Sequence, residues 1–196
     1  MKVQVKQIVG NWEDGYALDK HLIKSTFIGN NEYGHPQFDN LRTEVGESVF
    51  QLKYRSDFSQ APLLAKSLHS EIIPKLGKVH FIIPAPASND RNRQPVPEVA
   101  SELSKLMGIP FFPEFIGKAK HEAPLVSLKN LRERDAKIEA LKNRFVKKLD
   151  LSGNTKFNAL IIDDLYDSGA TMEAICNLVK SDKNVDKIYV AALTWK

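Results

Sequence analysis

NALIIDDLYDSGATM, residues Asn158–Met172, is the stretch from which the fold can be predicted. It opens with the apolar run Ala159–Ile162, and a short β-branched run between polar residues is typical of a strand buried on both faces of a parallel sheet. Two carboxylates, Asp163 and Asp164, follow this run. After a polar turn, the apolar residues recur with the period of a helix from Met172 onward. Strand, acidic end, small-residue turn and helix together indicate one unit of an open α/β sheet.

The turn Ser168–Thr171 has the residue types of a phosphate site. Ligands of open α/β sheets bind at the carboxyl ends of strands, and the free N–H groups that start a helix attract anions. Gly169 lets the backbone approach closely, while Ser168 and Thr171 add hydroxyl donors. The two carboxylates would repel a bare polyanion, so the pattern favours a ligand with hydroxyls near its phosphate, or one carrying a divalent cation. A sugar 5-phosphate meets the first condition, and a sugar phosphate with magnesium pyrophosphate meets both. The alternative is a solvated acidic turn after a core strand.

The segment DDLYDSGAT resembles the motif with which type I phosphoribosyltransferases bind PRPP, 5-phosphoribosyl 1-pyrophosphate. In that family the acidic pair binds the ribose 2- and 3-hydroxyls, and the turn binds the 5-phosphate. The resemblance implies Mg²⁺ as cofactor, which Asp163 and Asp164 contact indirectly through PRPP. The residues that it implies for binding the ribose and 5-phosphate are Asp163, Asp164, Tyr166, Asp167, Ser168, Gly169, Ala170 and Thr171.

Length and composition are those of a globular domain. The chain has 196 residues, 42% of them hydrophobic and 27% charged, with a net charge of +4. Neither a membrane-length apolar stretch nor the hydrophobic region of a signal peptide is evident, so we expect no membrane association. The single cysteine, Cys176, lies on the apolar face of the predicted helix and excludes an intramolecular disulfide. We expect a buried thiol and a cytoplasmic protein.

The N-terminal third predicts a mixture of strands and helices by its hydrophobic periodicity. The expected elements are a strand at 3–9, a turn at 11–15, a strand at 21–28, a long loop at 29–36, and helices at 42–54 and 60–76.

QLKYRSD, residues 51–57, resembles a second pattern. ComF-type proteins, a phosphoribosyltransferase-like family linked to DNA uptake, carry a similar LKYRGD segment before the first strand of the sheet. Ser56 stands where Gly is usual. Lys53 and Arg55 either contact phosphate or pack in a hood, as the resemblance suggests, or they form a solvated helix end. ComF proteins often carry a zinc module with several cysteines, and with one cysteine we expect no such module here.

Residues 78–86 predict a buried strand, and Val99–Met107 predicts a helix that ends at Gly108. In type I phosphoribosyltransferases, the loop after this strand holds pyrophosphate. PAPASNDRNRQP is similar to the ComF-like form of that loop, with Pro95 where Gly would be expected. Guanidinium groups match phosphate oxygens, although the alternative is a pair of solvated loop arginines. The resemblance implies pyrophosphate contacts from Ala87, Ser88, Asn89, Arg91 and Arg93.

A basic stretch, residues 117–148, contains ten Lys/Arg and four Asp/Glu residues. A strand is expected just before it at 110–116, a mobile loop at 117–126 and a helix at 128–145. In the family, a loop from this region closes over PRPP and often contributes a basic residue, for which Lys118 and Lys120 are candidates. The alternatives are a solvated helix face or contact with nucleic-acid phosphates.

Three residues are assigned catalytic roles by the resemblance: Asp167, Arg93 and Lys120. In the hypoxanthine–guanine branch, an Asp at the position of Asp167 acts as acid or base toward a purine nitrogen. The alternative for Asp167 is an exposed turn carboxylate. Trp195, at the end of a final strand predicted at 187–195, either stacks on an acceptor ring or caps the sheet.

We therefore predict an α/β protein with the type I phosphoribosyltransferase fold, a parallel, mostly five-stranded sheet with flanking helices. It forms a single domain, with an N-terminal hood at 1–57 and a PRPP-binding core at 58–196. The predicted activity is transfer of 5-phosphoribosyl from PRPP to a nitrogenous, purine-like acceptor, with release of pyrophosphate. The resemblance also implies a homo-oligomer. The alternative is a non-catalytic, ComF-like PRPP or nucleotide sensor that acts with DNA or a DNA-processing protein.

Overall fold

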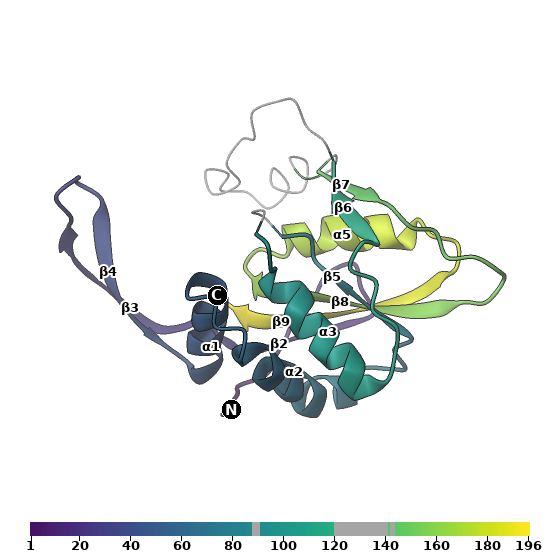
Figure 1. The fold of residues 1–196 in the computed structure, drawn as a ribbon, viewed down its shortest axis with the longest axis horizontal. Coiled ribbons are helices and arrows are strands. Elements are labelled where there is room, and N and C mark those ends of the chain that lie inside the picture. The colour runs from purple at the N-terminus through teal and green to yellow at the C-terminus, as the bar shows by residue number, and fades with distance from the viewer. Residues whose placement is uncertain (88–90, 120–140, 142–143) are drawn as a thin grey trace.

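A five-stranded sheet in the order β1-β2-β9-β8-β5 runs through the centre of the molecule (Figure 1). The computed structural model describes residues 1–87, 91–119, 141 and 144–196. Neighbouring strands are parallel except at one edge, where β1 pairs antiparallel with β2. This arrangement confirms the predicted α/β class and the mostly parallel sheet. The strands are β1 (Lys6–Gln7), β2 (Asp14–Lys20), β9 (Val185–Trp195), β8 (Phe157–Tyr166) and β5 (Phe81–Pro84).

The central strands are buried on both faces because their apolar side chains alternate between two cores. In β8, Leu160 and Ile162 pack into one core, whereas Ala159 and Ile161 pack into the other. Helices cover both sides, as predicted. The first core lies against α1 (Glu44–Tyr54), α2 (Gln60–Glu71) and α3 (Pro95–Met107), and the second lies against α5 (Ala170–Lys180).

The helices predicted at 42–54, at 60–76, at Val99–Met107 and after Met172 form, with small shifts at their ends. Gly108 ends α3 with φ 63°, the left-handed backbone conformation that glycine commonly adopts at the C-terminus of an α-helix. The helix predicted to reach residue 76 stops at Glu71, and a 3-10 turn, η1 (Ile73–Lys75), follows. Pro74 lacks the N–H that would continue the α-helix.

The N-terminal strands differ from the prediction. The strand expected at 3–9 is reduced to β1, and β2 was not predicted, since residues 11–15 were assigned to a turn. Within β2, only Ala17, Leu18 and Asp19 form a continuous buried run. Such a short run is below the length that periodicity recognises. Part of the expected hood region thus belongs to the central sheet.

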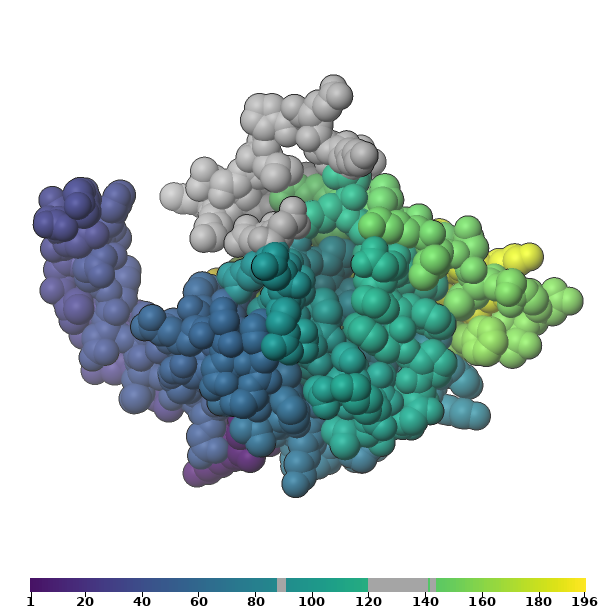
Figure 2. All heavy atoms as spheres, viewed as in Figure 1, coloured from purple at the N-terminus to yellow at the C-terminus, as the bar shows by residue number. Residues whose placement is uncertain are grey.

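A hairpin of β3 (Leu22–Asn30) and β4 (Pro36–Arg42) stands out from the body of the molecule (Figures 1 and 2). It begins at the carboxyl edge of the sheet, where the His21 N–H donates to the Trp195 carbonyl at 2.8 Å. The strand predicted at 21–28 is confirmed, but it lies outside the central sheet. The predicted loop at 29–36 contains the hairpin turn, and β4 was not predicted.

The strand predicted at 110–116 is wrong. Only a single bridge joins Phe111 to Ile82, and Phe112 and Phe115 pack on the Phe81 ring at centroid distances of 5.5 and 5.8 Å. The aromatic residues of this segment therefore fill the core beside the sheet without extending it. The strand here is β6 (Ile116–Lys118), antiparallel to β7 (Phe145–Lys147).

The placement of Phe145 in β7 also corrects the end of the helix predicted at 128–145. Most of that range, and the predicted loop beyond residue 119, lie outside the described residues.

Cys176, on α5, is buried in the core, as predicted, and burial raises the pKa of its thiol to about 12. Across the described parts of the chain, we find no helix with the length and apolar character needed to cross a bilayer.

Gly46 sets how closely α1 approaches the sheet, because a Cβ at this position would lie 2.1 Å from the His21 carbonyl oxygen. Replacing Gly by Ala inside a helix normally stabilises it by about 0.5–1 kcal/mol. We predict the opposite for Gly46→Ala, a loss of about 1–3 kcal/mol from overpacking, measured by urea unfolding. Ser48→Ala on the same helix is the control, with a change within about 0.5 kcal/mol. A stabilised Gly46→Ala protein would contradict the close packing.

Candidate functional site

The carboxyl end of β8 carries the predicted acidic pair. Asp163 and Asp164 are still in strand conformation, and Asp163 lies opposite Ala192 of β9. Both side chains are partly buried, and Asp163 Oδ1 accepts a hydrogen bond from the Asp164 N–H at 2.8 Å. β8, an interior strand of the sheet, thus holds two adjacent carboxylates at the edge where α/β proteins bind ligands.

Lys53, in the last turn of α1, forms an ion pair with Asp164. The side chains of Lys53 and Asp164 are only 27% and 17% exposed. Burial by itself would lower the pKa of Lys53, but the Asp164 carboxylate outweighs it and raises that pKa above its ordinary value. Lys53 is therefore a cation at the site, which favours the interpretation of this residue as part of the site over that of a solvated helix end.

Among the described residues, no cation forms an ion pair with Asp163. Burial, with the neighbouring Asp164 charge as the second cause, raises the pKa of Asp163 to about 7, and the nearby Lys53 charge opposes this rise.

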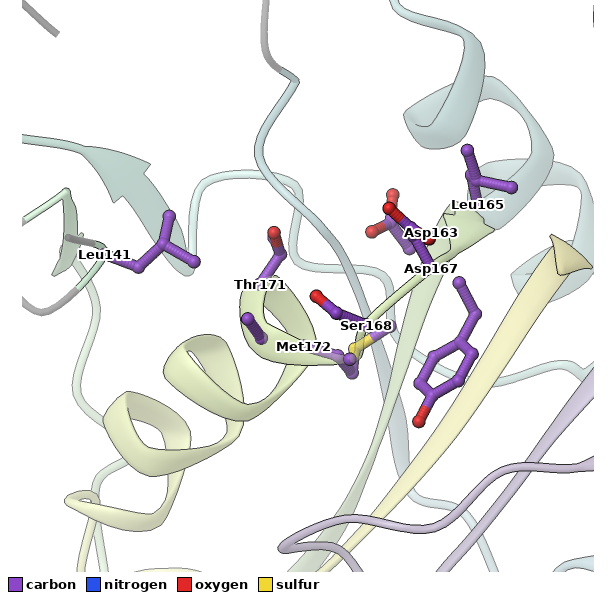
Figure 3. Close-up of a pocket in the computed structure, with 10 residues that line it drawn as sticks. Leu141, Asp163, Leu165, Asp167, Ser168, Thr171 and Met172 are labelled. Atoms are coloured by element: carbon purple, nitrogen blue, oxygen red, sulfur yellow. The ribbon is translucent and has the colours of Figure 1, made fainter. Parts of the chain in front are cut away.

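The turn after β8 forms the start of α5, as the sequence predicts. Gly169 adopts φ 80°, and among the described residues no side chain caps the helix start. The first N–H groups of a helix have no partner within it. Figure 3 shows the Ser168 and Thr171 hydroxyls here, with the Asp163 carboxylate at the end of β8. A cavity of about 180 Å³ lies at this turn, lined by Leu141, Asp163 and residues 165–172.

A second cavity, of about 360 Å³, adjoins the first and is lined by both residues of the acidic pair. Arg91 and Lys53 supply its cationic groups, and an Arg91 Nη donates a hydrogen bond to the Lys53 carbonyl. The two cavities share Asp163, Leu165 and Thr171 as lining residues. The remaining residues that line the second cavity are Ala85, Pro86, Ala87, Gln94, Pro95, Val96 and Asp164.

Tyr166 fastens the turn to the N-terminal segment. Its hydroxyl donates to the Val9 carbonyl at 3.3 Å, and its ring meets Trp12 edge-on at 6.4 Å between centroids. The Asn11 side chain in turn donates to the Glu173 carbonyl of α5 at 3.1 Å. These contacts were not predicted, because they join residues more than 150 positions apart.

Asp167 and Trp195 lie beside the turn. Asp167 is exposed, lines the smaller cavity, and has Lys196 Nζ at 3.6 Å from its carboxylate. Lys6 Nζ lies 4.0 Å from the centroid of the Trp195 ring. One face of that ring is therefore occupied by a cation at the edge of the sheet.

Arg93 is not among the described residues that line either cavity. Its guanidinium donates two hydrogen bonds to Glu98, at 2.9 and 2.8 Å, and lies 3.9 Å from the centroid of the Phe58 ring. Its predicted role at pyrophosphate would require this pair to open. Ser88, Asn89 and Lys120 lie outside the described residues, so their roles stay predictions.

The residues present fit a metal ion that arrives with its ligand. Among the described residues, no three His, Cys, Asp or Glu side chains gather in a way that could hold an ion. Mg²⁺ in proteins is commonly bound by one or two carboxylates together with substrate phosphates. Asp163 and Asp164, which both line the larger cavity, have the chemistry for that arrangement.

Comparisons with known proteins give structural similarities only. No family model and no curated protein sequence match the chain. The ComF-like resemblance therefore stays a prediction. Several solved structures that resemble the chain are phosphoribosyltransferases.

Three of these structures serve as examples of the similarity. Adenine phosphoribosyltransferase from Thermoanaerobacter pseudethanolicus is 18% identical with a TM-score of 0.43, covering 89% of this chain and 96% of that one. The Trypanosoma brucei enzyme, in complex with AMP, pyrophosphate and ribose-5-phosphate, is 15% identical with a TM-score of 0.45, covering 100% and 76%. A hypoxanthine phosphoribosyltransferase from Staphylococcus aureus is 14% identical with a TM-score of 0.42, covering 71% and 65%. At these values the likeness identifies no substrate for this chain.

The raised pKa of Asp163 predicts how stability changes with pH. The folded protein binds this proton more tightly than the unfolded chain, so the free energy of unfolding should fall as pH rises from about 4 to about 7. In Asp163→Asn no carboxyl group titrates at this position, so this fall in the free energy of unfolding should not occur. We expect the variant to be about 1–2 kcal/mol more stable than wild type at pH 8, a figure reduced for partial exposure, and nearly equal at pH 4. Urea unfolding at both pH values measures it, and a difference that is the same at the two pH values would contradict the raised pKa.

Proposed function

We propose that this protein binds PRPP with Mg²⁺ and transfers its 5-phosphoribosyl group to a nitrogenous acceptor, releasing pyrophosphate. The observation that carries the proposal is that Asp163 lines both of two adjoining cavities and Asp164 lines the larger one. One cavity lies at the start of a helix, and the other contains two cationic side chains. PRPP has this pattern of groups: a ribose with two hydroxyls, a phosphate on one side and a pyrophosphate on the other.

The smaller cavity suits the 5-phosphate. The N–H groups at the start of α5 and the Ser168 and Thr171 hydroxyls would donate to its oxygens. Gly169, at φ 80°, gives the turn a conformation that other residues rarely adopt. The carboxylates of Asp163 and Asp164 would accept hydrogen bonds from the ribose hydroxyls and fix the sugar between the two phosphate groups.

The larger cavity suits pyrophosphate. Arg91 and Ala87 line it, and the sequence resemblance implies both residues as pyrophosphate contacts. Negative charge develops on pyrophosphate as it leaves, so donors already in place there lower the barrier most. Mg²⁺, when bound, would supply further charge neutralisation on the phosphates, with Asp163 and Asp164 holding it indirectly through PRPP.

In the proposed reaction, a lone pair on the acceptor nitrogen forms a bond to C1 of the ribose. The bond from C1 to the pyrophosphate oxygen breaks, and its electron pair leaves with pyrophosphate. The proton on the acceptor nitrogen passes to a base, for which we propose Asp167, exposed at the rim of the smaller cavity. Arg93 and Lys120 are proposed to stabilise the leaving group.

Calorimetric titration of PRPP in the presence of Mg²⁺ tests this function. We expect wild type to bind PRPP, and Asp164→Ala to weaken binding at least tenfold because the ribose hydroxyls lose an acceptor of charge-assisted hydrogen bonds. Asp186→Ala is the matched control, because Asp186 is an exposed carboxylate near the start of β9, at the opposite edge of the sheet from the acidic pair. The affinity of this variant for PRPP should equal that of wild type.

Wild type that binds PRPP should then be screened for pyrophosphate release with purine and pyrimidine bases. No binding to wild type would contradict the proposal. The chain would then be tested for the alternative predicted from its sequence, a module that acts with DNA.

A further inference from the structure

We propose that Lys53 exchanges its partner when ligand binds: its ammonium leaves Asp164 for the ligand's pyrophosphate, and the ribose hydroxyls take its place on Asp164. Lys53 is then the residue that makes the site select a sugar phosphate with a pyrophosphate over one without it. The inference rests on the proposed function and assigns a specificity-determining residue within it.

The position of Lys53 permits both partnerships. Its side chain lines the larger cavity together with Arg91, Asp164 and the segment Ala85–Ala87. The same ammonium is paired with Asp164, which faces that cavity too. A lysine ammonium is a compact charge with three donors on a flexible four-carbon stem, so it can change partners by rotation of its side chain alone.

The backbone that carries Lys53 is fixed on both sides. An Arg91 Nη donates to the Lys53 carbonyl, which ties the end of α1 to the segment after β5. Gly46 brings α1 against the His21 carbonyl, and Val49 and Leu52 are buried in the core below it. The exchange therefore requires no movement of α1, only of the side chain.

The partial burial of the ion pair makes the exchange selective. Separating two partly buried charges is unfavourable unless each finds a new partner. Ribose 5-phosphate offers hydroxyl donors to Asp164 but no pyrophosphate to Lys53, and free pyrophosphate offers the reverse. PRPP offers both at once. The ion pair thus raises the affinity for PRPP relative to that for either fragment.

A purely structural role for Lys53 predicts something different. If Lys53 only held Asp164 or the end of α1 in place, its loss would reduce the affinities for ribose 5-phosphate and for PRPP by the same factor. Repulsion of phosphate by the unpaired carboxylates acts on both ligands and more strongly on PRPP, which carries more charge, so the aspartate variants described below separate this general effect from the exchange. The ratio of the two affinities is therefore the informative quantity.

Calorimetric titration of PRPP and ribose 5-phosphate, both with Mg²⁺, measures that ratio. We expect Lys53→Met to reduce the preference for PRPP at least tenfold, and Lys53→Arg to keep it within about threefold of wild type. Lys66→Met removes the same charge from an exposed position on α2 and should leave the ratio unchanged. An unchanged ratio in Lys53→Met would overturn the inference while leaving the proposed function intact.

A second pair of variants tests the exchange without removing Lys53, in case Lys53→Met does not fold. Asp164→Asn frees the Lys53 ammonium, so magnesium pyrophosphate should bind at least fivefold tighter than to wild type. Asp163→Asn removes a neighbouring carboxylate that does not pair with Lys53, and should increase affinity by less than twofold. Equal increases in the two variants would show a general loss of negative charge and overturn the exchange. If wild type binds neither PRPP nor pyrophosphate, the proposed function fails and the inference fails with it.

Discussion

The ion pair between Lys53 and Asp164 is the interaction on which the site depends. Two consecutive aspartates at the end of a central strand cannot both remain charged and partly buried without a nearby cation. The cation comes from α1, whose approach to the sheet is set by Gly46. The contact that supplies a cation to the acidic end of β8 therefore comes from 111 positions earlier in the chain. The other carboxylate, Asp163, forms no ion pair with a described residue, and burial, followed by the Asp164 charge, raises its pKa to about 7.

Residues near both ends of the chain contact the acidic pair, the Ser168–Thr171 turn and the helix that follows it. Tyr166 and Asn11 fasten the turn and α5 to the N-terminal segment, and Thr194, near the C-terminus, donates to the Asp164 carbonyl at 2.8 Å. The Tyr166 side chain packs so closely on Gly169 that a Cβ at position 169 would lie 2.9 Å from the Tyr166 hydroxyl. The acidic pair and the turn are thus positioned by residues that are distant in sequence, and a rigid turn is what recognition of a phosphate requires.

How far the sequence predicts the structure depends on the range of the interaction. The unit from β8 to α5 was predicted because Ala159–Ile162 and the helix after Met172 follow clear periods, and its glycine turn needs few residues to specify it. β2 was missed because its buried run is short, and β4 because it belongs to a hairpin with little burial on either face. The segment at 110–116 was assigned wrongly because its aromatic residues pack in the core as a cluster, a role that apolar character cannot distinguish from a strand.

For the site, the sequence predicted the acidic pair and the turn, but it left Lys53 undecided, since its pairing with Asp164 spans 111 positions. Arg93 could not be seen to pair with Glu98 until α3 was in place.

The central claim is that the acidic pair lies between a phosphate site and a pyrophosphate site. A crystal structure of the protein with PRPP and Mg²⁺ tests it most directly. The account predicts the 5-phosphate at the Ser168–Thr171 turn, both ribose hydroxyls on Asp163 and Asp164, and the pyrophosphate beside Arg91 in the larger cavity. A ligand bound with its 5-phosphate away from the turn, or with its ribose hydroxyls away from the two aspartates, would contradict the account.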